Sequence, residues 1–233
     1  MNNIRTALQG QQGDRRLRLG IAGGEWKKMM ADATARTRFA SEVKKIIEQY
    51  EFDGVDFDFE WPANASEYNN YSATVIQMRS TLGKYVYFTA SLHPVSFKIS
   101  PEAIDALDFI SYQCYGPAVM RFPYEQFVKD GEAAVAYGIP KNKLVMGVPF
   151  YGSTGSLIAA YCDFVNDGLA TTNEDTYTYK GNTYTFNSIE TIRKKARYVC
   201  EEDYAGIMSW DLATDIDITN NKSLLKVIKE EFE

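Results

Sequence analysis

The stretch Phe-Asp-Gly-Val-Asp-Phe-Asp-Phe-Glu-Trp-Pro at residues 52–62 decides the fold. Three of its four acidic residues, Asp56, Asp58 and Glu60, are spaced by two, so on a β-strand their side chains all point to one face. Successive carboxyl groups would then stand roughly 6–7 Å apart along the strand. The two phenylalanines between them point to the opposite face, toward covering helices. We therefore predict a strand with one acidic and one apolar face.

Around this stretch, short apolar runs alternate with amphipathic segments whose apolar residues recur every three or four positions, which is typical of βα units and a parallel sheet. Six such units predict a (β/α)8 barrel whose first two βα units are absent. A doubly wound open sheet is the alternative. The barrel is favoured because the chemistry-bearing residues follow the carboxyl ends of several strands. The strands are expected at residues 17–23, 54–60, 85–92, 108–115, 144–150 and 205–210.

Residues 175–186 alternate tyrosine and threonine around Gly181-Asn182, which predicts a β-hairpin. We expect it as a small insertion over residues 174–186, before the last strand. The chain contains no linker, low-complexity tract or internal repeat. Residues 1–233 are therefore expected to form a single domain.

Composition excludes several classes of protein. The net charge of −6 and pI near 5.0 argue against a nucleic-acid-binding protein, which normally carries a basic face. The three cysteines are an odd number without CxxC or metal-type spacing, so neither a disulfide framework nor a structural zinc site is expected. No run of about 18 apolar residues is present, so no membrane span is expected.

The acidic face itself suggests acid catalysis. Three buried carboxyl groups cannot all ionise at low cost, because burial and like charge both raise carboxyl pKa values. We expect at least one proton to be retained near neutral pH, as a glycosidase requires to protonate a leaving-group oxygen. A calcium loop is disfavoured, because the glycine and glutamate offsets of an EF-hand are missing. A solvated acidic strand is disfavoured by the apolar residues interleaved with the acids.

Residues 52–62 resemble the signature strand of glycoside hydrolase family 18, the chitinases and endo-β-N-acetylglucosaminidases. Further segments are similar to the family's strands in the family's order, which implies a TIM barrel of the chitinase type. Residues 17–24 followed by Trp26 resemble its third strand, residues 108–115 its sixth, residues 146–152 its seventh, and residues 206–210 followed by Asp215 its eighth.

The resemblance implies substrate-assisted hydrolysis with retention, in which the acetamido oxygen of the sugar attacks its own anomeric carbon and forms an oxazolinium intermediate. Glu60 would then serve as general acid and afterwards as general base. Asp58 would hydrogen-bond the acetamido N–H, and Asp56 would share a proton with Asp58. Tyr115 matches the tyrosine whose hydroxyl holds the acetamido oxygen.

Substrate-binding residues follow from the same resemblance. Gln113 lies two residues before Tyr115 on the same face and matches a glutamine found in part of the family. Trp210 would form the apolar floor under the distorted sugar. For Tyr151 and Trp61, both at strand ends, stacking on a sugar and packing within the protein fit equally well.

Two positions stand apart from this assignment. Gly116 departs from many bacterial members, which carry an aspartate directly after the tyrosine, although plant-type members also lack it. His93, the only histidine, ends the fifth strand of the family order, and no catalytic role requires it.

The expected function is hydrolysis of β-1,4-linked N-acetylglucosamine polymers such as chitin, without a metal or other cofactor. The alternatives are an endo-β-N-acetylglucosaminidase acting on N-glycans and a non-catalytic lectin on the same scaffold. Lectins of this type typically lose the proton donor, whereas this chain keeps Glu60. A polymeric substrate implies that the parent protein is secreted or lies at the cell surface.

The family's first two strands should precede the strand at residues 17–23, where only about 16 residues are available. Residues 3–10 are expected to be the end of the helix before that strand. A six-stranded barrel leaves unpaired strand edges, which other chains can pair with. We therefore expect a barrel that is truncated at its N-terminal side, with oligomer formation if another chain pairs with the open edge.

Overall fold

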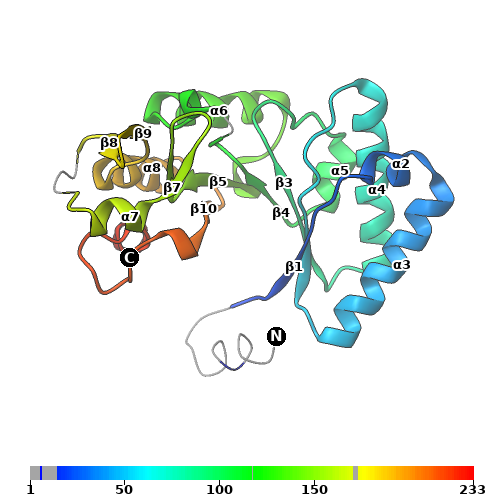
Figure 1. The fold of residues 1–233 in the computed structure, drawn as a ribbon. Helices are drawn as coiled ribbons and strands as arrows, with labels where there is room; N and C mark the ends of the chain where they lie inside the picture. Colours follow the sequence, from blue (N-terminus) through cyan, green and yellow to red (C-terminus); the bar gives the residue numbers. More distant parts are fainter. Residues whose placement is uncertain (1–5, 7–14, 117, 170–172) are drawn as a thin grey trace. The chain divides into compact units, whose positions relative to one another are not determined.

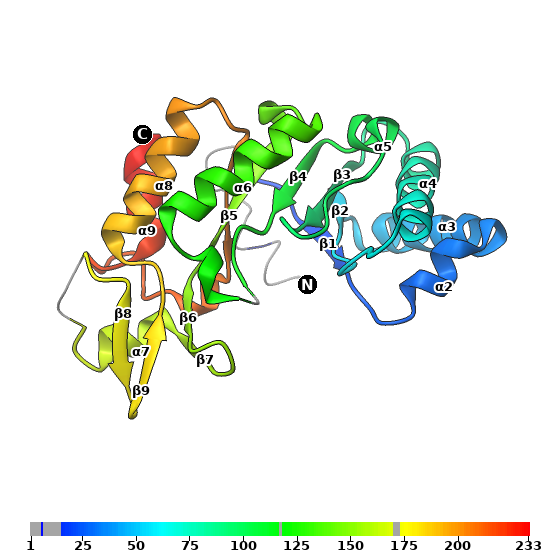
Figure 2. The same ribbon diagram turned by 90° about the horizontal axis from the view of Figure 1, so that it is seen from above.

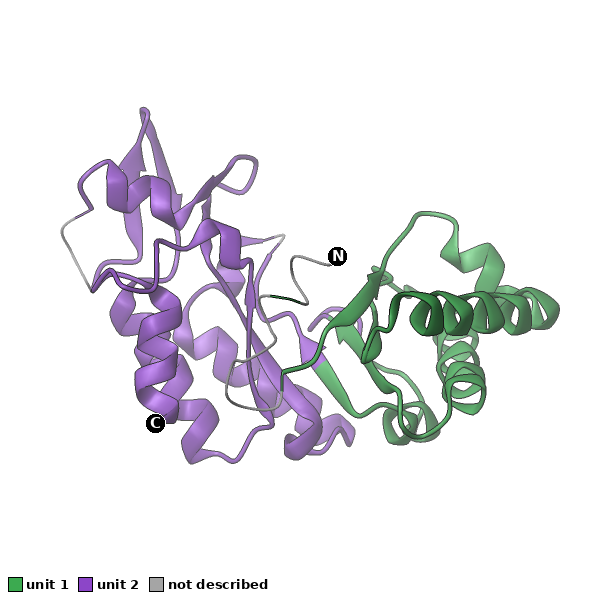
Figure 3. Ribbon diagram, turned by 90° about the horizontal axis from the view of Figure 1, so that it is seen from below, with its two compact units in different colours: residues 1–92, 98–110 green, residues 93–97, 111–233 purple. Residues whose placement is uncertain are grey.

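The computed structural model describes residues 6, 15–116, 118–169 and 173–233. The helix end predicted at residues 3–10 therefore lies, apart from Thr6, outside the described residues. The chain divides into two compact units, residues 1–92 with 98–110 and residues 93–97 with 111–233 (Figure 3). That residues 1–233 form one domain stays a prediction.

The first unit is built on three parallel strands, β1 (Arg18–Ile21), β2 (Gly54–Phe57) and β3 (Tyr87–Leu92). Asp56 lies opposite Gly20 on β1 and opposite Thr89 on β3. Figures 1 and 2 show the helices of this unit gathered on one side of the strands. These helices are α2 (Trp26–Ala31), α3 (Ala33–Tyr50), α4 (Ala65–Leu82) and α5 (Pro101–Ala106).

Local sequence signals set the ends of the two long helices. Asp32 begins α3, and its carboxylate accepts the Ala35 N–H at 2.7 Å. Asn64 begins α4 in the same way, accepting the Glu67 N–H at 3.0 Å. Helix α4 ends at Gly83, which has a positive φ of 80° that glycine adopts without a steric penalty.

An aromatic core lies between β2 and these helices, on the apolar face predicted for the acidic stretch. Phe57 and Phe59 are buried, with ring centroids 5.3 Å apart. Phe57 packs on Phe39 of α3 at 5.9 Å, and Phe59 packs on Trp26 of α2 at 6.0 Å. This packing confirms that the phenylalanines face the helices, and it assigns Trp26 to the core.

The second unit contains the remaining strands of the main sheet, β5 (Leu144–Pro149) and β10 (Gly206–Trp210), which pair in parallel. Strand β4 (Phe109–Tyr112) begins in the first unit and ends in the second. Figure 2 shows α8 and α9 side by side in this unit. Its helices are α6 (Tyr124–Tyr137), α7 (Tyr161–Asn166), α8 (Ile189–Glu201) and α9 (Leu224–Phe232), with short 3-10 turns η1 (Val119–Arg121), η2 (Lys141–Lys143) and η3 (Leu212–Thr214).

The six strands of the main sheet have the hydrogen-bonding order β1-β2-β3-β4-β5-β10, which follows the chain without reversal. A doubly wound sheet reverses its order at a switch point, so this alternative is excluded. The described residues thus contain six successive parallel strands of a (β/α)8 barrel, as predicted.

The predicted hairpin is confirmed as β8 (Thr176–Tyr179) and β9 (Asn182–Thr185). It belongs to a larger feature that the sequence pattern did not indicate, a four-stranded antiparallel sheet completed by β6 (Tyr151–Ser153) and β7 (Ile158–Ala160). Phe164 of α7 fills this sheet's core against Tyr184 at 5.5 Å. Strands of three residues carry too short a pattern to be recognised by period.

The strands of the main sheet are shorter than predicted, most clearly β1, β2 and β4. Strand β2 ends at Phe57, before Glu60. Strand β4 ends at Tyr112, because the Cys114 N–H turns back to the Tyr112 carbonyl at 2.9 Å and leaves the ladder. In the part of the chain that the structure describes, no helix is long and apolar enough to cross a bilayer.

Candidate active site

The acidic stretch keeps its alternation beyond the end of β2. The Asp58 N–H donates to the Ile21 carbonyl of β1 at 2.9 Å, which extends the parallel ladder by one residue. Asp56 and Asp58 are partly buried, whereas Glu60 is exposed. The expectation of three buried carboxyl groups is therefore wrong for Glu60, because the strand has ended before it.

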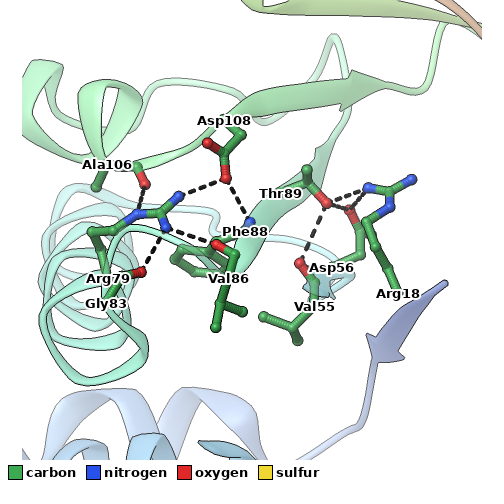
Figure 4. A network of polar contacts seen from close by, with 10 residues as sticks. All are labelled: Arg18, Val55, Asp56, Arg79, Gly83, Val86, Phe88, Thr89, Ala106 and Asp108. Atoms are coloured by element: carbon green, nitrogen blue, oxygen red, sulfur yellow. Dashed lines mark hydrogen bonds and ion pairs between the residues drawn. The ribbon is translucent and has the colours of Figure 1, made fainter. Parts of the chain in front are cut away.

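Asp56 is surrounded by hydrogen-bond donors from both neighbouring strands (Figure 4). Ser91 Oγ of β3 donates to Asp56 Oδ2 at 2.8 Å, and Thr89 Oγ1 donates to Asp56 Oδ1. Arg18 Nη1 of β1 lies 3.3 Å from the same Oδ1 atom and also contacts Thr89 Oγ1. Both carboxylate oxygens of Asp56 are thus occupied by protein donors, one of them a cation.

Sequence reasoning missed these three partners. Thr89 and Ser91 are spaced by two on β3, so they share a face, and Thr89 is in register with Asp56. Arg18 lies two residues before Gly20, whose register partner is also Asp56. The sequence does show charged or hydroxyl residues at alternate positions of the flanking strands. These residues can be recognised as partners of Asp56 only once the register of the strands is known.

A second polar network holds β3 and the start of β4 together (Figure 4). The Arg79 guanidinium, from α4, donates to the carbonyls of Val86 and Ala106 at 2.9 and 2.7 Å. It also donates to Asp108 Oδ2 at 2.7 Å, and the same oxygen accepts the Phe88 N–H at 2.7 Å. This network anchors β3, which carries two of the three partners of Asp56.

Tyr71 of α4 lies close to the acids and was also missed. Its side chain is fully buried, and burial raises the pKa of its hydroxyl, an effect that the carboxylates of Asp56 and Asp58 increase. Among the described residues, this hydroxyl has no hydrogen-bond partner. The phenol is therefore a neutral polar group inside the aromatic core.

In the second unit, Tyr115 follows β4 and is held by residues of other strands. Its hydroxyl donates to Met208 Sδ of β10 at 3.6 Å, and its ring meets the Tyr151 ring edge-to-face at 6.4 Å. A Cβ atom on Gly147 of β5 would come within 2.8 Å of Tyr115 Cε1. The glycine in Met-Gly-Val therefore makes room for the tyrosine ring.

Gly116, the position where many bacterial members carry aspartate, has a physical explanation. Its φ is +33°, and a Cβ atom there would lie 2.9 Å from the Tyr151 hydroxyl. The positive φ and the approach of Tyr151 therefore both favour glycine after Tyr115. The Tyr151 ring also packs on Phe122 at 5.7 Å, so this tyrosine takes part in packing.

The other predicted binding residues differ in exposure. Trp210 ends β10 with 54% of its surface exposed, which leaves an aromatic face free for stacking. Gln113 is buried at 7% exposed, and Trp61 is half-buried.

The structure places the predicted residues in two groups. The acids and Trp61 belong to the first unit. Gln113, Tyr115, Tyr151 and Trp210 belong to the second unit. That the two groups form one site stays a prediction. Within the described residues, no cluster of three or more His, Cys, Asp or Glu side chains is arranged to hold a metal ion.

Comparison with known proteins identifies relatives. The model of the family described as glycosyl hydrolases family 18 matches residues 5–215. Among curated proteins, the chain is 23% identical to "Probable chitinase 2" of Drosophila melanogaster, covering 93% of this chain but only 60% of the relative.

Solved structures share the fold. The GH18 chitinase from the chitin utilization locus of Flavobacterium johnsoniae matches with a TM-score of 0.84 and 24% identity, over 99% of this chain and 79% of that one. A plant class V chitinase mutant from Cycas revoluta, in complex with (GlcNAc)3, matches with a TM-score of 0.77 and 20% identity, over 93% of this chain and 81% of that one.

Proposed function

Because this chain belongs to glycosyl hydrolases family 18, we propose that it hydrolyses β-1,4-linked N-acetylglucosamine polymers, such as chitin or chitooligosaccharides. The observation that carries the proposal is the acidic stretch, in which Asp56, Asp58 and Glu60 alternate with buried phenylalanines. The relatives named as chitinases, one of them in complex with (GlcNAc)3, support the substrate class.

The proposed mechanism divides the work among the acids. Glu60, which is exposed at the end of the stretch, protonates the leaving-group oxygen and then activates water. Asp58 orients the acetamido group of the substrate, whose oxygen closes an oxazolinium ring at the anomeric carbon. Tyr115 holds the acetamido oxygen during this attack. Asp56, both of whose carboxylate oxygens accept from protein donors, anchors β2 to the neighbouring strands β1 and β3.

The test is turnover of a fluorogenic chitobioside by the wild-type chain and by Glu60→Gln. We expect the variant to lose hydrolysis and to keep oligosaccharide binding, because the amide preserves the shape but cannot donate an acidic proton. The matched control is Glu67→Gln, which removes a carboxylate from the surface of α4, where it pairs with Lys27 at 2.8 Å. Turnover by Glu60→Gln at the wild-type rate would refute the assignment of Glu60.

A non-catalytic lectin is the second candidate, because the fold also matches a chitinase-like agglutinin from Robinia pseudoacacia, with a TM-score of 0.75 and 18% identity over 93% of this chain. Binding of chitooligosaccharides without any turnover by the wild-type chain would favour it. Product analysis with a high-mannose glycopeptide would separate chitin hydrolysis from endo-β-N-acetylglucosaminidase activity.

A further inference from the structure

His93 is buried in the second unit at 1% exposed, and it makes hydrogen bonds with both ring nitrogens. Its Nε2 lies 2.6 Å from the Gly116 carbonyl oxygen and 3.0 Å from that of Tyr115. Its Nδ1 accepts the Val95 N–H at 3.2 Å. The residue therefore links the turn after β3 to the backbone directly after β4.

These partners assign the protonation state of the ring. Because Nδ1 accepts a hydrogen bond from Val95, the proton is on Nε2, which donates to the two carbonyl oxygens. Burial lowers the pKa of His93, and the two carbonyls only partly offset this effect; Arg121 lowers the pKa further and Asp130 raises it. The neutral imidazole with its proton on Nε2 is thus the form that satisfies all three hydrogen bonds.

The histidine itself is held by a tight turn. The Ser96 N–H donates to the His93 carbonyl at 2.6 Å, and the His93 N–H donates to the Ser96 carbonyl at 3.4 Å. This pairing fixes the backbone of His93 while its side chain reaches residues 22 and 23 positions later.

His93 binds the backbone at Tyr115 and Gly116, and the conformation of this backbone sets the direction of the Tyr115 side chain. The bonds to the Tyr115 and Gly116 carbonyls restrain the two peptide planes that follow the tyrosine, at a point where Gly116 has a positive φ. At the other end of the side chain, the Tyr115 hydroxyl donates to Met208 Sδ at 3.6 Å. The direction of the ring is thus set by His93 at the backbone and by strand neighbours at the tip.

We propose that His93 is a positioning residue for Tyr115, acting through its Nε2–H···O bonds to the Tyr115 and Gly116 carbonyls. This role rests on the proposed function, in which the Tyr115 hydroxyl holds the acetamido oxygen. A displacement of about 1 Å at a reacting group can lower turnover about 100-fold, so a residue outside the chemistry can control the rate.

Two substitutions distinguish the donor role of Nε2 from the acceptor role of Nδ1. His93→Gln keeps an N–H donor near the position of Nε2, whereas His93→Asn keeps an acceptor near Nδ1 and loses the donor toward the carbonyls. On a fluorogenic chitobioside, we expect His93→Asn to lower kcat about 10- to 100-fold with a smaller change in KM, and His93→Gln to keep most of the turnover. Equal loss in both variants, at unchanged melting temperature, would overturn the proposal.

A double-mutant cycle tests whether the effect passes through Tyr115. If it does, His93→Asn should cause little further loss of kcat in a Tyr115→Phe background. Additive losses would show that His93 acts elsewhere and would overturn the proposal. If His93→Asn fails to fold, His93→Gln in both backgrounds gives the same test, because its small loss should vanish when Tyr115 is replaced.

A readout independent of activity separates this proposal from the proposed function. The ring carbon resonances of Tyr115, in protein labelled with 13C-tyrosine, are assigned by their loss in Tyr115→Phe. We expect them to shift in His93→Asn and to stay near their wild-type positions in His93→Gln. This pattern in a chain that cleaves no chitobioside would support the positioning role and refute the proposed function. Unshifted resonances in both variants would refute the positioning role.

Discussion

Arg18 Nη1 on β1 lies 3.3 Å from Asp56 Oδ1 on β2, so the first of the three acids spaced by two is paired with a permanent cation. The two side chains are 29% and 16% exposed, which shields the pair only partly from water. The guanidinium also lies over the Phe109 ring, with Cζ 4.7 Å from its centroid. Together with Thr89 and Ser91 of β3, which donate to the same carboxylate, this pairing holds Asp56 between the two neighbouring strands.

Replacing Arg18 should therefore affect both stability and turnover. We expect Arg18→Met to lower the free energy of unfolding by about 1–3 kcal/mol, because a partly buried carboxylate loses a charged donor. Turnover of a chitobioside should fall as well, since Asp56 lies at the base of the proposed catalytic strand. The free energy is measured by urea denaturation.

Lys27→Met is the matched control, because Lys27 forms an exposed ion pair with Glu67, whose loss should cost no more than about 1 kcal/mol. Equal behaviour of the two variants in stability and turnover would contradict the role given to Arg18.

Lys195 should make stability rise with pH above neutrality. It is fully buried, donates to the Phe122 carbonyl at 2.7 Å and to Asn187 Oδ1 at 2.8 Å, and burial lowers its pKa from 10.5 to about 7. Between these two pKa values the unfolded chain binds one more proton than the folded chain. The free energy of unfolding should therefore increase with pH, by up to about 1.4 kcal/mol per pH unit.

Urea denaturation at pH 7, 8 and 9 measures this slope. Lys195→Met should remove the contribution of this lysine, whereas Lys194→Met, at the exposed neighbouring position, should leave the slope unchanged. An identical slope in wild type and Lys195→Met would show that the buried amine does not titrate in this range.

The hydroxyl of Tyr71 should contribute nothing to stability. It is buried without a hydrogen-bond partner among the described residues, so Tyr71→Phe should leave the free energy of unfolding unchanged or raise it by up to about 1 kcal/mol. Tyr161→Phe is the same chemical change at a buried tyrosine whose hydroxyl donates to the Lys222 carbonyl at 2.9 Å. That variant should lose about 1–2 kcal/mol, and a similar loss at Tyr71 would reveal a partner for its hydroxyl.

The close approach of Tyr151 to Gly116 should make any side chain at position 116 costly. Gly116→Ala places a Cβ atom 2.9 Å from the Tyr151 hydroxyl at a φ of +33°, and we expect a loss of about 1–3 kcal/mol. Adding Tyr151→Phe should recover part of this loss, since it removes the clashing oxygen. Gly23→Ala, with nothing within 4 Å of the new Cβ, is the control and should be close to neutral in thermal unfolding.

The local pattern was sufficient to predict the core elements of this fold. Alternation in the acidic stretch has the two-residue period of a strand, so it identified the apolar face on which Phe57 and Phe59 pack. The Tyr and Thr alternation around Gly181 predicted the hairpin for the same reason. The ends of strands were less predictable, because β4 ends where Cys114 turns back to Tyr112, and this turn has no periodic signature.

What the sequence by itself determined is therefore the class of fold and the family resemblance, and the acids of the proposed site are predicted from it; all of these depend on residues close together in the chain. Only the tertiary structure decided which residues distant in the chain contact the predicted site residues. Arg18 reaches Asp56 because the register of β1 with β2 brings together residues 38 positions apart. His93 reaches the Tyr115 carbonyl across 22 positions, by a contact that no local period encodes.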